Sequence, residues 1–204
     1  MSEALTFYTH PMSRGRVVRW MLEEVGQPYD TVLLDFATTA KAPDYLAINP
    51  MGKVPALTHG QTVVTETAAI CAYLADAFPE AGLAPPLAER GAYYRWLFFA
   101  AGPLESTVIT QALGFEVPAE RRVMAGWGSH GDVLNALEIA VSQGDYIAGP
   151  QFTAADLYVG AHLGWGMQMG GVEARPAFKA YVDRLDARPA ALRAVQIDDD
   201  LIKA

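Results

Sequence analysis

Residues 54–70, VPALTHGQTVVTETAAI, contain three expected elements in close succession. Residues 55–58 and 62–64 are short runs rich in apolar and β-branched side chains, which is typical of strands. Between them, residues 59–61 (HGQ) form a tight turn with a central glycine, so the two strands are expected to pair as an antiparallel hairpin. The apolar pattern then changes to a helical period over residues 67–78. The stretch therefore predicts a hairpin followed directly by a helix.

The residues upstream of this stretch predict two more strands. Residues 4–8 and 31–34 are strand-like, and a helix between them is expected to be capped by Ser13 and to stop at Gly26. A short helical piece around residues 44–46 precedes the hairpin. Two strands joined through a helix run parallel, whereas a hairpin is antiparallel. The order βαβαββα therefore predicts an α/β domain with a mixed four-stranded sheet.

Strand-like alternation disappears after residue 80. We expect a first domain over residues 1–80, a stiff linker over 81–88 that includes two adjacent prolines, and an all-helical domain over 89–204. Pro103 is expected to kink the first helix of the second domain, because proline lacks a backbone donor. The helices expected there span residues 88–113, 119–142, 154–168, 176–187 and 189–195.

Composition narrows the class of protein. Of the 204 residues, 51% are hydrophobic and 19% are charged, which is typical of a globular chain. A net charge of −8 disfavours nucleic acid and anionic membranes as partners. The single cysteine, Cys71, excludes an intramolecular disulfide, and no apolar run reaches the roughly 20 residues of a membrane span. We therefore expect a soluble, cytoplasmic protein, and we expect no metal site.

Five motifs resemble those of the cytosolic glutathione S-transferase family. Residues 54–57 (VPAL) and 65–70 (TETAAI) resemble its glutathione-binding half, and residues 22–26 (LEEVG) resemble the end of its first helix. Residues 152–156 (FTAAD) resemble its helical-domain capping motif, and residues 188–190 (RPA) its C-terminal signature. The resemblance covers nearly the whole chain and is to a bacterial member. It implies a thioredoxin-like N-terminal domain followed by an all-helical C-terminal domain.

The same resemblance implies how glutathione is bound as co-substrate. It implies a cis bond between Val54 and Pro55, with the backbone of Val54 paired to the cysteinyl residue of glutathione as in strand addition. A helix N-terminus attracts anions, so the γ-glutamyl carboxylate is expected at Thr67, with Glu66 on the ligand's ammonium group. Taken alone, Thr67 would be a helix cap and Glu66 a solvated acid.

Lys53, directly before this motif, suits the glycyl carboxylate of glutathione by its charge. Its position fits one that contacts the ligand in the family. Lys41 is the alternative for the same role, although either lysine is also compatible with a solvated surface position.

Chemistry at the glutathione sulfur requires the thiolate. Lowering a thiol pKa of about 8.5 by two units takes about 2.7 kcal/mol, which one hydroxyl and a helix N-terminus can supply. The donor is therefore expected between Tyr8 and Arg14, and Ser13 is the first choice because it also precedes the helix. Arg14 offers a fixed charge, Tyr8 offers a phenol, and His10 is a turn residue that could serve as a base.

The thiol-activating position departs from the family pattern. Counting back from residues 22–26, the serine of serine-type members falls on Met12, and the cysteine of cysteine-type members falls on Arg14. Neither can play that part, and Ser13 lies one residue away. The transferase class is therefore left open.

The resemblance implies a transferase that activates the glutathione thiolate for attack on a small hydrophobic electrophile, with a role in detoxification. It also implies a homodimer formed through the first helices of the second domain. Phe36 and Leu113 are candidates for an apolar wall around the electrophile. The alternatives are another glutathione-dependent enzyme (a peroxidase, dehalogenase, isomerase or lyase) or a non-catalytic binding module, which Met12 in the serine position favours.

Overall fold

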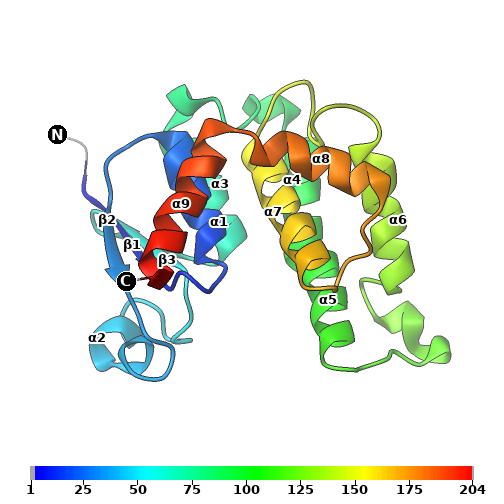
Figure 1. Ribbon diagram of the computed structural model, residues 1–204, viewed down its shortest axis with the longest axis horizontal. Helices are drawn as coiled ribbons and strands as arrows, with labels where there is room; N and C mark the ends of the chain where they lie inside the picture. Colours follow the sequence, from blue (N-terminus) through cyan, green and yellow to red (C-terminus); the bar gives the residue numbers. More distant parts are fainter. Residues whose placement is uncertain (1–2, 204) are drawn as a thin grey trace. The chain divides into compact units, whose positions relative to one another are not determined.

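The computed structural model describes residues 3–203 and divides the chain into two compact units (Figure 1). The first unit combines the described residues up to 83 with those from 188 onward, and the second unit is residues 84–187. This differs from the sequence-based division, which assigned every residue after 88 to the second domain. The last helix belongs to the first unit instead of the second.

The first unit has the expected βαβαββα order and ends with an additional helix. Strands and helices of this unit, including the two short 3₁₀ helices η1 and η2, are β1 (Leu5–Thr9), α1 (Gly15–Val25), β2 (Asp30–Leu33), η1 (Thr39–Lys41), α2 (Pro43–Leu46), β3 (Ala56–His59), β4 (Thr62–Thr65), α3 (Thr67–Ala77), η2 (Pro79–Ala81) and α9 (Pro189–Lys203).

The four strands form one mixed sheet in the order β2-β1-β3-β4. β1 runs parallel to β2 and antiparallel to β3, and β3 and β4 form the predicted hairpin. The end of β1 therefore lies beside the start of β3, since Tyr8 pairs with Ala56, and Ala56 in turn pairs with Thr65 at the end of β4. One end of the sheet collects the turns that lead into α1, β3 and α3.

The sheet is covered on both faces. Because side chains alternate along a strand, neighbouring residues of β1 point to opposite faces. Phe7 is fully buried with its ring 5.1 Å from the guanidinium carbon of Arg19 on α1, and α1 also packs against α3. On the other face, Tyr8 lies 5.7 Å from the ring of Tyr45 in α2.

The last helix, α9, packs along α1. Its pattern predicted a helix over residues 189–195, but α9 continues to Lys203. Two acidic residues in the extension make ion pairs with α1: Asp198 with Arg19, and Asp199 with Arg16. These tertiary contacts hold the extension in helical form, although carboxylates near a helix C-terminus are unfavourable to the helix dipole.

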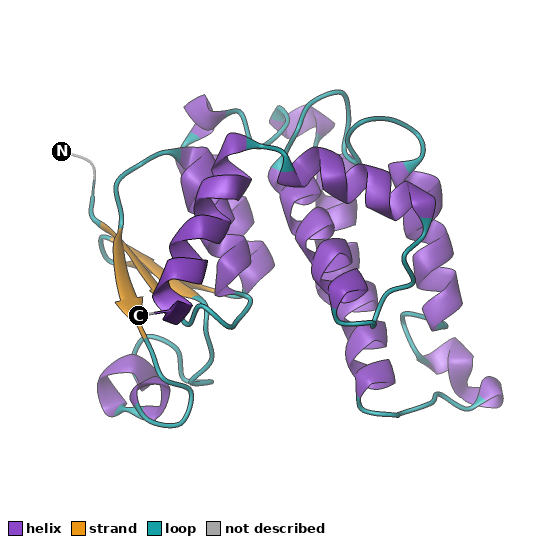
Figure 2. Ribbon diagram, viewed as in Figure 1, coloured by secondary structure: helices purple, strands orange, loops and turns teal. Residues whose placement is uncertain are grey.

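The second unit is built of helices joined by loops, and its described residues include one isolated β-bridge between Tyr146 and Gly149 (Figure 2). Its elements are the 3₁₀ helix η3 (Leu87–Glu89), α4 (Gly91–Phe99), the π-helical segment η4 (Ala100–Leu104), α5 (Glu105–Ala112), the 3₁₀ helix η5 (Ala119–Met124), α6 (His130–Val141), α7 (Ala154–Gln168) and α8 (Pro176–Asp186).

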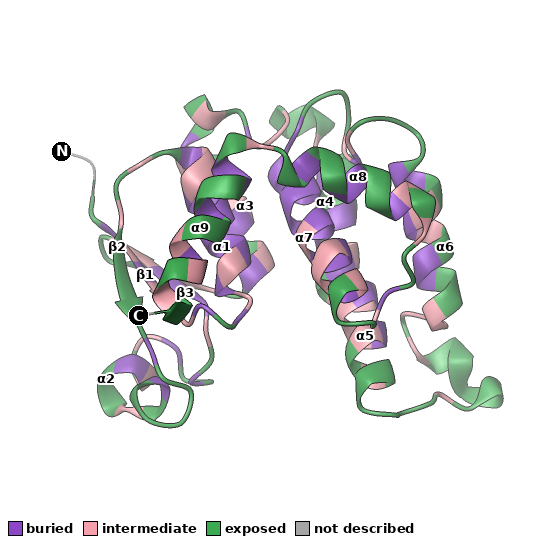
Figure 3. Cartoon of the chain, in the orientation of Figure 1, coloured by how far each residue is buried: buried purple, intermediate pink, exposed green. Residues whose placement is uncertain are grey.

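Two of the expected helices are interrupted. The helix expected over residues 88–113 contains the π-helical segment with Pro103 inside it, so the proline widens the helix locally. The helix expected over 119–142 is split, because Gly128 has a positive φ of 66° and Ser129 caps a new helix through a capping box. α7 carries more buried residues than any other helix of this unit (Figure 3).

No helix among residues 3–203 combines the length and apolarity that crossing a bilayer would require.

Candidate functional site

The predicted ligand-binding residues gather at one end of the sheet. The register that pairs Ala56 with Thr65 places Val54, two residues before Ala56, next to the start of α3 at Thr67. The loop from β1 to α1, which carries Ser13, leaves the same end, because β1 and β3 are antiparallel neighbours. Hydrogen-bonding groups from three separate segments are thus brought together.

The Val54–Pro55 peptide bond is cis, as the resemblance implies. Within residues 3–203, neither the N–H nor the C=O of Val54 has a backbone hydrogen-bond partner. The preceding loop is held by the carbonyl oxygen of Lys53, which accepts hydrogen bonds from Tyr45 Oη at 2.5 Å and Asn49 Nδ2 at 2.8 Å. The peptide groups of Val54 are thereby fixed in place and unpaired.

Glu66 and Thr67 begin α3. Glu66 occupies the capping position with a φ of 67° and a ψ of 119°, which a residue with a side chain rarely adopts, and its side chain is exposed. Thr67 is the first helical residue and is buried, so it is not itself the cap. The helix therefore opens with N–H groups and the Thr67 hydroxyl in its first turn, and such a terminus favours a carboxylate.

The two lysines have different surroundings. The Lys41 ammonium donates to the carbonyl oxygen of Gly52 at 2.7 Å, so it braces the loop before Val54. The Lys53 side chain is exposed and has no ion pair among residues 3–203. The geometry therefore assigns loop support to Lys41 and leaves Lys53 available for an anionic ligand.

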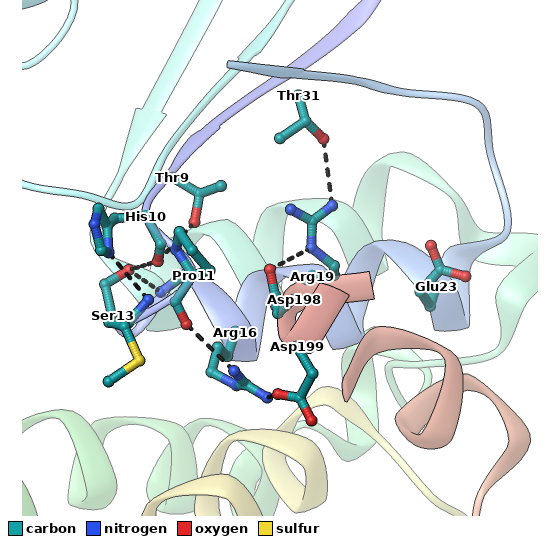
Figure 4. Close-up of polar contacts among 12 residues, drawn as sticks. Thr9, His10, Pro11, Ser13, Arg16, Arg19, Glu23, Thr31, Asp198 and Asp199 are labelled. Atoms are coloured by element: carbon teal, nitrogen blue, oxygen red, sulfur yellow. Dashed lines mark hydrogen bonds and ion pairs between the residues drawn. The ribbon is translucent and has the colours of Figure 1, made fainter. Parts of the chain in front are cut away.

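Ser13 precedes α1, but the expected cap geometry is wrong. α1 begins at Gly15, and Arg14 occupies the capping position without a side-chain cap. The Ser13 Oγ accepts the N–H of Gly15 at 2.9 Å and donates to the carbonyl oxygen of His10 at 2.6 Å (Figure 4). Ser13 thus closes the loop by a local turn, and its hydroxyl is next to the helix start.

The other candidates in this loop are placed differently. His10 accepts the N–H of Met12 on Nδ1 at 3.0 Å, and its ring stacks on Phe36 with the centroids 4.2 Å apart. A His10 ring that accepts on Nδ1 carries its proton on Nε2. The Tyr8 ring packs into the cluster around Tyr45 on the α2 face of the sheet. Arg14 is partly buried in the turn that precedes α1.

Two charged residues near the loop were not identified from the sequence. The Arg16 guanidinium donates from Nη1 to the carbonyl oxygen of Pro11 at 3.3 Å and from Nη2 to Asp199 at 2.6 Å (Figure 4). The signal in the sequence was the complementary spacing of two arginines, at 16 and 19, and two aspartates, at 198 and 199. Because 183 residues separate Arg16 from Asp199, the pattern gives no register between them.

Cys71 is fully buried in α3, and burial raises the pKa of its thiol to about 12. It therefore stays protonated and inert. Among residues 3–203, no group of three or more His, Cys, Asp or Glu side chains is arranged to hold a metal ion.

Comparison with known proteins identifies the family. Residues 3–76 match the model of the glutathione S-transferase N-terminal domain, and residues 109–189 match that of its C-terminal domain. Glutathione S-transferase 3 of Zea mays is 32% identical, with 94% of this chain and 93% of the relative covered. The chain belongs to the glutathione S-transferase family. The predicted thioredoxin-like domain and helical domain are thereby confirmed.

Solved glutathione transferases have the same fold. The crystal structure of a glutathione transferase from Methylococcus capsulatus is 30% identical, with a TM-score of 0.79 over 96% of this chain and 99% of that one. A sphingomonad glutathione S-transferase, solved in complex with glutathione, is 30% identical with a TM-score of 0.76 over 95% of this chain and 98% of that one. Relatives that bind glutathione therefore share this architecture.

Proposed function

We propose that this transferase binds glutathione along the end of the sheet, with its cysteinyl backbone paired to the free peptide groups of Val54 beside Pro55. The γ-glutamyl carboxylate lies at the start of α3 on the Thr67 hydroxyl, and Glu66 holds the ammonium group. Lys53 pairs with the glycyl carboxylate. The observation that carries the proposal is the convergence of these groups at one end of the sheet.

Ser13 is the proposed donor to the glutathione thiolate. A hydroxyl has one proton and rotates freely, so Ser13 can turn its O–H from the His10 carbonyl oxygen to a sulfur anion, which is the stronger acceptor. The Gly15 N–H donates to the Ser13 hydroxyl oxygen and thereby polarises the hydroxyl further. Arg14, at the start of α1, adds positive charge nearby.

The thiolate then attacks a small hydrophobic electrophile. Phe36, whose ring stacks on His10 of the serine-bearing loop, is 48% exposed and is therefore accessible to an apolar co-substrate. We place this detoxifying reaction in the cytoplasm, in keeping with the single buried cysteine. Peroxide reduction, dehalogenation, isomerisation or ether cleavage with glutathione would use the same thiolate.

We also propose that the enzyme is a homodimer. Tyr94 and Phe98 lie four residues apart on one face of α4 and are 41% and 71% exposed. A second copy of the chain would cover both aromatic rings in an isologous interface. Light scattering should give the mass of a dimer for the wild type and of a monomer for Phe98→Glu. A monomeric wild type would refute this part of the proposal.

A non-catalytic glutathione-binding module is the second candidate, because the Ser13 hydroxyl already donates a hydrogen bond to the His10 carbonyl oxygen in this structure. Calorimetry with glutathione, followed by an ultraviolet titration of the bound thiol, separates the two. The transferase lowers the thiol pKa below its value of about 8.5 in solution. Binding with an unshifted thiol pKa would identify the module, and no binding at all would exclude both functions.

A further inference from the structure

The loop between β1 and α1 is tied to itself by three short contacts. Ser13 donates to the His10 carbonyl oxygen, Met12 donates to the His10 ring, and the Gly15 N–H donates to the Ser13 oxygen. These bonds fix the local shape of the turn. They do not fix where the turn lies on the unit, because every partner belongs to the same short segment.

Two contacts attach the loop to other parts of the unit: the His10 ring stacks on Phe36, and Arg16 makes the polar attachment. Its Nη1 donates to the Pro11 carbonyl oxygen at 3.3 Å, and its Nη2 pairs with Asp199 Oδ1 at 2.6 Å (Figure 4). Pro11 directly follows His10, whose carbonyl oxygen accepts the hydrogen bond from the Ser13 hydroxyl. A planar guanidinium that bonds two acceptors at once has little freedom to move. Arg16 therefore joins the serine-bearing loop to α9.

Asp199 is itself held by its neighbour on α9. Asp198 accepts from Arg19 Nε at 2.9 Å, and both residues of this pair are only 1% exposed. Arg19 also donates from Nη1 to the Thr31 hydroxyl at 3.3 Å, which ties the pair to β2 (Figure 4). A pair so deeply buried is costly to break, so α9 cannot slide along α1 without losing it. The Asp199 carboxylate is thus presented at a fixed position.

We infer that Asp199 is a positioning residue for the thiol-activating serine: it holds Arg16 against the Pro11 carbonyl oxygen and thereby sets the place of Ser13. The inference rests on the proposed function, and it makes the C-terminal helix part of the catalytic apparatus of the first unit. Neither Asp199 nor Arg16 touches the sulfur in this account.

The sign of one pKa change tests this account against simple electrostatics. Removing the negative charge of Asp199 leaves Arg16 unneutralised near the site, so a purely Coulombic effect would lower the pKa of the bound glutathione thiol. Loss of positioning moves the Ser13 donor away and raises that pKa. The two explanations therefore predict opposite shifts for Asp199→Asn.

The experiment compares the full-length wild type with Asp199→Asn, Arg16→Met and the double variant. Asp199→Asn should raise the pKa of the bound thiol and lower kcat by about three- to tenfold, with a smaller change in glutathione affinity. Asp199→Glu should recover part of the loss. Because Asp199 acts through Arg16, the double variant should be no worse than Arg16→Met alone.

Arg193→Gln is the matched control. Arg193 on α9 pairs with Glu23 on α1 at 3.1 Å, so its loss removes an α1–α9 ion pair that does not reach the loop. It should leave the thiol pKa and kcat unchanged. The positioning role is wrong if Asp199→Asn lowers the thiol pKa or has the same thiol pKa and kcat as Arg193→Gln. It is also wrong if the effects of Asp199→Asn and Arg16→Met on kcat are fully additive in the double variant.

Failure of the proposed function would look different. In that case the wild type itself would not shift the glutathione thiol pKa, or Ser13→Ala would leave it unshifted, and the positioning role would fall with it. If the wild type and Ser13→Ala behave as proposed and only Asp199→Asn does not, the function stands and the inference alone is overturned.

Discussion

Ser13 and His10 share one hydrogen bond, in which the serine hydroxyl donates to the histidine carbonyl oxygen over 2.6 Å. The same hydroxyl oxygen accepts the Gly15 N–H, so Ser13 is held as an acceptor while its proton can still be redirected. In the proposed complex the thiolate competes with a neutral carbonyl for that proton, and the charged acceptor forms the stronger bond.

Ser13→Ala should therefore raise the pKa of enzyme-bound glutathione and lower kcat/KM by about 10²- to 10³-fold, the usual effect of removing one donor to a reacting anion. Tyr8→Phe should change kcat/KM little, since the Tyr8 ring packs on the α2 face. Steady-state kinetics and ultraviolet titration measure both quantities. The reverse ranking of the two variants would transfer the donor role to Tyr8.

Lys53→Met should weaken glutathione binding by about two- to fivefold, a small effect because the lysine is exposed. The matched ligand is γ-glutamylcysteine, which lacks the glycyl carboxylate. Its dissociation constant should be the same for the wild type and Lys53→Met. Calorimetry with both ligands decides this, and an equal loss for both would show that Lys53 does not contact the glycyl end.

The positions of the motifs proposed to bind glutathione were predictable because these motifs are local. Residues 54–57 and 65–70 each combine a strand end with a turn or a helix start, and the hairpin register that joins them follows from the short connection. The positions of Val54, Glu66 and Thr67 relative to one another could therefore be predicted without any tertiary information.

Features that depend on distant partners were not predictable. The acidic run at residues 198–200 ends the apolar pattern of the last helix, and its ion pairs with the arginines of α1 could not be predicted from the sequence. The residue that caps α1 is Arg14 rather than the predicted Ser13, and the first helical residue, Gly15, lies close to the end of β1. A β-carbon on Gly15 would overlap the hydroxyl oxygen of Thr9, and no pattern in the sequence reports that closeness.

Gly15→Ala should test that closeness. The added methyl group meets the buried Thr9 side chain, so we expect a loss of about 1–3 kcal/mol in unfolding free energy and a fall in kcat/KM as the start of α1 shifts. Adding Thr9→Ala should restore part of both. Gly91→Ala in α4 is the control, because among residues 3–203 no atom beyond its chain neighbours and its own helix backbone lies within 4 Å of the added methyl group. Equal unfolding free energies for Gly15→Ala and Gly91→Ala, measured in urea, would contradict this prediction.

Asp156 in α7 should give the second unit a distinctive pH dependence. Its carboxylate is fully buried and accepts hydrogen bonds from Ile147 N at 2.6 Å, Tyr181 Oη at 2.8 Å, and the N–H and hydroxyl of Thr153, both at 2.9 Å. Burial raises the pKa of Asp156 above its ordinary value of 3.8, and the hydrogen bonds oppose that rise.

A carboxyl pKa that is raised on folding means that the folded protein binds the proton first as the pH falls. Between the raised folded pKa and 3.8, the contribution of Asp156 to the unfolding free energy therefore increases as the pH falls, and above that window it is constant. Asp156→Asn removes this slope. It should also cost about 1–3 kcal/mol near neutral pH, because the new amide N–H₂ faces buried donors.

Thr153→Ala is the control for Asp156→Asn. It removes the hydroxyl hydrogen bond, one of those that lower the pKa of Asp156, and keeps both the backbone N–H bond and the carboxyl group, so it should cost about 0.5–2 kcal/mol and retain the slope. In Thr153→Ala the pH range over which the unfolding free energy depends on Asp156 should extend to higher pH, since the pKa of Asp156 rises further. Urea unfolding across the acid range measures each curve. A wild-type curve parallel to that of Asp156→Asn throughout the window would show that Asp156 does not titrate there.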